Sequence, residues 1–152
     1  MARKNVSWIL VADGKQARIY GNDGPGKGLY RATDREFRIE LPEKTHDIIS
    51  DREGRAINPG SHSPQTISPR TDPRDRLEAE FLHTVAAELD AAGDARLFDR
   101  LILIAPPKVL GVLRSALGKH TAALVTRDLD KDLVHMPQRN LEQHLIDAGI
   151  IL

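Results

Sequence analysis

Residues 101–105, Leu-Ile-Leu-Ile-Ala, followed by Pro106-Pro107, are the stretch that decides the fold. Such a short, uninterrupted apolar run is typical of a central β-strand that is covered on both faces, and the two prolines end it. A helix is predicted next, closed by Gly118, with the apolar residues Val109, Leu110, Val112, Leu113 and Leu117. Residues 122–126 then predict a last strand, parallel to the first, so this half of the chain forms a strand–helix–strand unit.

The N-terminal part of the chain predicts an antiparallel meander. Val6–Ala12 is a short apolar run, and the Asp13-Gly14 pair that follows favours a hairpin turn into a second strand at Gln16–Gly21. A weaker pattern predicts a third strand within Leu29–Ile39. Together the two halves predict an α/β fold with a single mixed β-sheet and helices packed on it.

The most clearly marked helix is predicted over residues 73–92. Asp72 suits the N-cap, Pro73 suits the first helical position, and Gly93 can end the helix. A C-terminal helix is predicted after Pro137, with Leu141, Leu145 and Ile146 facing inward. The inward face of the 73–92 helix is predicted to consist of Leu77, Phe81, Leu82, Val85, Ala86 and Leu89.

Composition narrows the class of protein. The 152 residues fit one domain, 1–152, and 40% hydrophobic residues predict a globular chain. Lys plus Arg and Asp plus Glu number 22 each, which argues against bulk electrostatic binding of nucleic acid. Absence of Cys excludes thiolate sites. Without a recognisable signal peptide or an apolar span of membrane length, we expect a cytoplasmic chain with no membrane partner and no cofactor.

A long loop is predicted at residues 54–72, directly before the 73–92 helix. Three prolines and little periodicity exclude a helix or a central strand there. Loops of this length are usually functional or disordered, and both alternatives stay open. Candidate nucleic-acid contacts are four arginines at the flanks, Arg55, Arg70, Arg74 and Arg76.

Two further patterns concern catalysis and metals. Asp13 follows the first strand, where a metal-dependent nuclease would hold a carboxylate, with Asp99 and Asp128 as the possible partners. A hairpin turn explains the Asp13-Gly14 pair well enough and is the favoured interpretation. His62 lies inside the long loop and could act as a general base. The histidines show no metal-ligand spacing, so no metal site is predicted.

Several short motifs, in their order and spacing, resemble the bacterial host-attachment protein family over nearly the whole chain. That resemblance implies a role in attachment to a host cell, without a chemical activity. The motifs are residues 8–14 (Trp-Ile-Leu-Val-Ala-Asp-Gly), Ala17-Arg18, Asp72-Pro73, residues 98–101 (Phe-Asp-Arg-Leu), residues 105–107 (Ala-Pro-Pro), Leu110-Gly111, Leu113-Arg114 and residues 130–133 (Asp-Lys-Asp-Leu).

The family in turn resembles the middle domain of eukaryotic and archaeal peptide-release factors, which implies a ribonuclease H-like mixed sheet. In release factors a Gly-Gly-Gln loop before a long helix promotes peptidyl-tRNA hydrolysis on the ribosome. The 54–72 loop has the corresponding position, but Gly60 and Gln65 are separated by four residues, so the motif is absent. By this resemblance Gln65 would position a water, assisted by His62.

These expectations leave three hypotheses for the function. The first is a ribosome- or tRNA-associated protein that presents the 54–72 loop, and any catalysis would be peptidyl-tRNA hydrolysis. The second is a non-enzymatic module that binds a protein partner and affects attachment indirectly. The third is a metal-dependent nuclease that uses Asp13.

Overall fold

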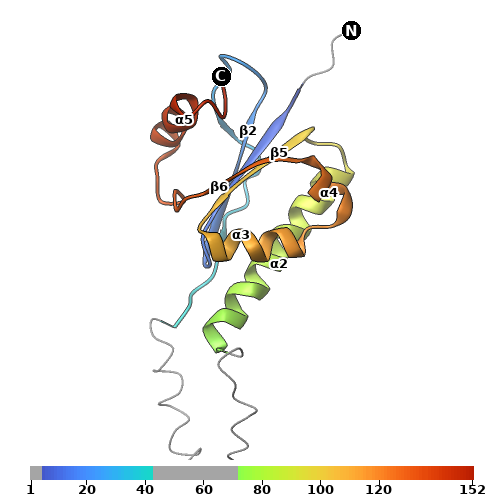
Figure 1. Ribbon diagram of the computed structural model, residues 1–152, viewed down its shortest axis with the longest axis vertical. Coiled ribbons are helices and arrows are strands. Elements are labelled where there is room, and N and C mark those ends of the chain that lie inside the picture. Colours follow the sequence, from blue (N-terminus) through green and yellow to red (C-terminus); the bar gives the residue numbers. More distant parts are fainter. Residues whose placement is uncertain (1–4, 43–71) are drawn as a thin grey trace, which may run out of the picture.

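The computed structural model of the chain describes residues 5–42 and 72–152. These residues form one mixed β-sheet with the strand order β3-β2-β1-β5-β6, in which β4 also pairs with β2 (Figure 1). The strands are β1 (Ser7–Ala12), β2 (Gln16–Asn22), β3 (Tyr30–Arg31), β4 (Phe37–Arg38), β5 (Arg100–Ala105) and β6 (Val125–Asp130). The helices are α2 (Pro73–Asp94), α3 (Pro107–Ala116), α4 (Lys119–Leu124) and α5 (Gln138–Asp147). The predicted α/β class is confirmed.

Pairing in the sheet changes direction at β1. β2 runs antiparallel to β1, and Ala12 pairs with Ala17 beside the Asp13-Gly14 turn, as the hairpin prediction requires. β5 lies parallel to β1 on its other side, and β6 lies parallel to β5. The antiparallel meander and the parallel strand–helix–strand unit therefore join where β1 pairs with β5.

Both faces of the sheet are buried, which explains the uninterrupted apolar runs. Leu10 and Leu103 face α2 and α3, while Ile9 and Ile104 face the layer that contains α5. Figure 1 shows α2 and α3 on one side of the sheet and α5 on the other. Because successive side chains of a strand point to opposite faces, a strand between two helical layers needs an apolar residue at every position.

α2 begins as predicted but differs at two positions. Phe81, Val85 and Leu89 are buried, whereas the side chain of Leu77 is 39% exposed. Leu77 lines an open hollow between the start of α2 and β4, which leaves its side chain accessible to solvent. Gly93 does not end the helix but is buried inside it.

Gly93 is needed where α4 approaches α2. A Cβ atom at Gly93 would lie 3.2 Å from Thr121 Oγ1 and 3.3 Å from Phe98 Cζ, closer than most Cβ contacts. The approach of α4 also corrects the prediction of a strand at residues 122–126. Helix α4 continues to Leu124 and packs its buried Thr121 against α2, so the strand starts only at Val125.

Three smaller predictions are also corrected. The third strand is divided into β3 and β4, because Arg35 donates its backbone N–H to Thr33 Oγ1 (3.2 Å) in a local turn between them. Gly118 does not close α3, which ends at Ala116; it is the N-cap of α4, and its N–H donates to Asp90 of α2 at 3.0 Å. On α5, Leu141 and Leu145 are buried but Ile146 is 38% exposed.

Replacing Asp72 tests whether its side chain stabilises the N-terminus of α2. The Oδ1 atom of Asp72 accepts the backbone N–H of Arg74 at 2.8 Å. We expect Asp72→Ala to lower the free energy of unfolding by about 1 kcal/mol, because one N–H group loses its partner. Urea unfolding followed by circular dichroism measures this change. An unchanged midpoint would show that the cap contributes nothing.

Within the described parts of the chain, no helix is both long enough and apolar enough to cross a membrane.

Candidate functional site

The C-terminal ends of the three parallel strands β1, β5 and β6 lie on the same side of the sheet, which is here called the carboxyl edge. β1 ends there at Ala12, β5 at Ala105 and β6 at Asp130. In open α/β sheets, ligands commonly bind beyond the carboxyl ends of parallel strands. The residues that follow these strand ends are therefore the candidates for a ligand-binding site.

Asp13 is the polar residue that follows β1, and the turn holds its carboxylate in a fixed orientation. Its Oδ1 atom accepts the backbone N–H groups of Lys15 and Gln16, each at 2.9 Å. Only 15% of the side chain is exposed. An Asx-type turn explains this arrangement, as the hairpin interpretation predicts, but it uses only one carboxylate oxygen. The Oδ2 atom remains directed toward His135.

His135 reaches Asp13 from the segment between β6 and α5. Its Nε2 atom lies 3.6 Å from Asp13 Oδ2, and its Nδ1 atom lies 3.3 Å from the amide nitrogen of Gln16. Val134 is 1% exposed and anchors this segment in the core, while Gln16 is 8% exposed. The buried amide of Gln16 therefore contacts Nδ1 of the His135 ring, while Nε2 of the same ring faces the Asp13 carboxylate.

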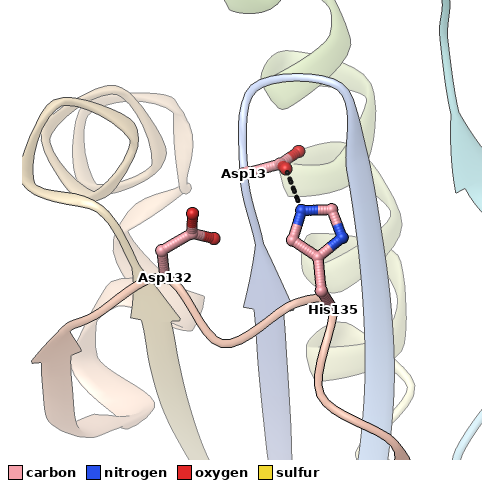
Figure 2. Close-up of side chains that lie close together, drawn as sticks. All are labelled: Asp13, Asp132 and His135. Atoms are coloured by element: carbon pink, nitrogen blue, oxygen red, sulfur yellow. Dashed lines mark ion pairs between the residues drawn. The ribbon is translucent and has the colours of Figure 1, made fainter.

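Asp132 completes the cluster. It lies two residues beyond the end of β6 and is exposed. One ligand atom from each of Asp13, Asp132 and His135 lies within 4.8 Å of the others, and the three side chains converge from both sides of the carboxyl edge (Figure 2). Two carboxylates and an imidazole are common ligands of divalent metal ions.

The carboxylates predicted to join Asp13 in a nuclease do not do so. Asp99 lies at the opposite end of β1, where its Oδ2 atom accepts the backbone N–H of Val6 at 2.9 Å. Asp128 lies within the edge strand β6, where it pairs with Leu103, and forms an ion pair with Arg114 of α3. The predicted set Asp13, Asp99 and Asp128 is therefore wrong, because β1 and β5 are parallel and Asp99 precedes β5.

Two predicted phosphate contacts lie in the first turns of α2. Arg74 is bonded to the carbonyl oxygen of Pro42, and its Nε atom lies 3.7 Å from Glu78 Oε2. Arg76 is more accessible: its side chain is 79% exposed, and its Nε atom lies 3.9 Å from Glu80 Oε1. Arg74 thus holds residue 42 against α2, whereas Arg76 is available to a partner.

A further ion pair fixes α2 to α3 at the same edge. Lys108, at the start of α3, bonds to the carboxylate of Asp75 in the first turn of α2. The hydrogen bond to Asp75 raises the pKa of Lys108 above its ordinary value. Because both side chains are largely exposed, the pair orients the two helix starts more than it stabilises the fold.

The remaining predicted site residues, Gln65, His62, Arg55 and Arg70, lie outside the described residues. From the sequence, Asp132 and His135 were not grouped with Asp13. They follow the last parallel strand, so a correct end of β6 would have placed them at the edge where Asp13 lies. That edge position was the available signal.

Comparison with known proteins gives a family, a relative and solved structures of similar fold. The model of the family described as "Protein required for attachment to host cells" matches residues 8–145. An uncharacterised protein of Rickettsia prowazekii (strain Madrid E) is 27% identical over 143 residues, which cover 92% of this chain and 87% of that protein. The crystal structure of an archaeal translation termination factor has a TM-score of 0.51 at 12% identity. The match covers 95% of this chain but only 39% of the factor, and it shows similarity of fold.

Proposed function

Because the chain belongs to the family of proteins required for attachment to host cells, we propose that it influences attachment indirectly, as a ribosome- or tRNA-associated protein of the cytoplasm. The fold similarity to a translation termination factor, over 95% of the chain, supports this proposal. Fold similarity alone does not carry function, so local geometry must add to it.

The observation that carries the proposal is the contact between Arg74 and Pro42. The guanidinium of Arg74 donates to the carbonyl oxygen of Pro42, so residue 42 lies beside the start of α2. The intervening segment, which includes the predicted 54–72 loop, therefore leaves and re-enters the described fold at one place. The release-factor resemblance implies a loop directly before a long helix, and a segment that leaves and re-enters the described fold at the start of α2 supports it.

Arginines around that place are the proposed contacts to RNA phosphates. Arg76 is exposed in the first turns of α2, and Arg55 and Arg70 belong to the expected loop and its end. Arg74 was predicted as a contact too, but its bonds to Pro42 and Glu78 give it a structural role first. If the loop has activity, Gln65 would position the attacking water and His62 would assist, as a peptidyl-tRNA hydrolase requires.

Binding to purified ribosomes tests the proposal. We expect the chain to pellet with ribosomes at low salt and to be released as salt rises, because phosphate contacts release counterions. Three to four such contacts give a slope of log K against log salt of about −2 to −4. Binding that does not change with salt, or no binding at any salt, would contradict an RNA-contacting role.

A protein partner is the second candidate, and one surface favours it. A hollow of about 490 Å³ lies between β4 and α2, lined in part by Phe37, Ile39, Leu77 and Phe81. The exposed apolar side chain of Leu77 in this hollow is the kind of surface that protein partners cover. In this case the chain would bring down a protein from lysate treated with ribonuclease.

A further inference from the structure

We propose that Asp13, Asp132 and His135 form a binding site for a divalent transition-metal ion of the zinc class. This inference is independent of ribosome binding and concerns the carboxyl edge alone. The Asp13 carboxylate and the His135 ring come from segments more than 100 residues apart in the chain (Figure 2). Each is held by contacts outside the cluster, which favours a built site over a chance meeting of surface charges.

The separation of the two best-held donor atoms fits a shared metal ion. Asp13 Oδ2 and His135 Nε2 are 3.6 Å apart. With metal–ligand distances of about 2.1 Å, this separation corresponds to an angle of about 118° at the metal, close to tetrahedral. Ligand atoms of a tetrahedral ion lie about 3.4 Å apart, so Asp132, which lies within 4.8 Å, has to shift by up to about 1.4 Å. Its exposed side chain permits that shift.

Gln16 contacts the His135 ring nitrogen that would face away from the metal. A histidine that binds metal through Nε2 carries its proton on Nδ1 and donates it to a fixed acceptor. The Gln16 amide lies 3.3 Å from Nδ1 and is 8% exposed. Amide oxygen and nitrogen exchange places by a 180° rotation, so the Gln16 oxygen can accept this proton. The Nε2 lone pair then faces Asp13.

The donor set also selects among metals. One imidazole and two carboxylates suit zinc-like ions, whereas magnesium prefers oxygen ligands and retains most of its water. Three protein ligands leave the fourth position of a tetrahedral ion open to water, which is the arrangement of catalytic rather than structural zinc sites. The ion would therefore be exchangeable and accessible to a small ligand from solvent.

Metal titration of the full-length chain, first stripped with a chelator, tests the proposal. We expect one equivalent of Zn²⁺ or Co²⁺ to bind in calorimetry, with Mg²⁺ far weaker, and Co²⁺ to give the visible absorption of a four-coordinate ion. His135→Ala and Asp132→Asn should each weaken binding by about 100-fold or more, and Gln16→Leu by about 10–100-fold. Melting curves without metal show whether each variant is folded.

Matched controls use side chains of the same type elsewhere on the surface. His83→Ala on α2 and Asp34→Asn between β3 and β4 replace exposed residues outside the cluster, and we expect both to bind metal as the native chain does. The proposal is overturned if the native chain binds no Zn²⁺, or if folded His135→Ala and Asp132→Asn variants bind Zn²⁺ as tightly as the controls. The latter result would place the ion on other histidines of the chain.

Discussion

A chain carrying Arg55→Glu, Arg70→Glu and Arg76→Glu is expected to bind ribosomes on the order of 100-fold more weakly at about 0.1 M salt than the native chain. Each reversal replaces an attraction to phosphate by a repulsion. The slope of log K against log salt should also become shallower by about one for each lost contact. Arg74 is kept, because its bond to Pro42 belongs to the fold.

The control for this variant carries the same change in net charge at another part of the molecule. Arg96, Arg100 and Arg127 are exposed; Arg96 precedes β5 and Arg100 is its first residue, at the end of the sheet opposite the carboxyl edge. Reversal of these three should weaken binding only slightly, through long-range electrostatics. Equal losses in the two variants would mean that net charge, rather than the start of α2, governs binding.

Leu103→Ala is expected to lower the free energy of unfolding by about 3–4 kcal/mol, a large part of the stability of an ordinary domain. Leu103 is fully buried in the middle of β5 and belongs to the core between the sheet and α2. It lies between two paired strands and in the same core cluster as residues of α2 and α3, so its neighbours can move only slightly into the space left by the side chain. Urea unfolding monitored by Trp8 fluorescence and by circular dichroism measures the loss.

Leu97→Ala makes the same chemical change at an exposed position. The side chain of Leu97 is 54% exposed, in the connection between α2 and β5. Its removal should cost less than about 0.5 kcal/mol, because little apolar surface leaves water there on folding. A cost for Leu103→Ala no larger than that of Leu97→Ala would contradict the placement of β5 between two helical layers.

Sequence patterns predicted the central elements well, because these depend on local chemistry. β1 and β5 are apolar at successive positions since both of their faces are covered, and Asp72-Pro73 marks the start of α2. Sequence patterns gave the wrong element where contacts between distant segments decide the secondary structure. Residues 122–125, Ala-Ala-Leu-Val, fit a buried helix or a strand equally, and the packing of α4 on Gly93 decides the outcome.

The candidate site was only half predictable. Asp13 was recognised both as a turn residue and as a possible metal ligand, and the structure gives it the turn contacts of the first interpretation. Its neighbours Asp132 and His135 depend on where β6 ends, and the misplaced strand at residues 122–126 concealed them. The position of Gln16 beside His135 follows from tertiary packing across 119 residues of sequence, which no local pattern contains.

Sedimentation of native lysate in a sucrose gradient, with and without ribonuclease, tests the proposed function most directly. Detection of the chain with an antibody should place it with ribosomal particles, and ribonuclease should move it to the top of the gradient. A chain that stays at the top in both samples would contradict ribosome association, and its similarity to the termination factor would then concern the fold alone.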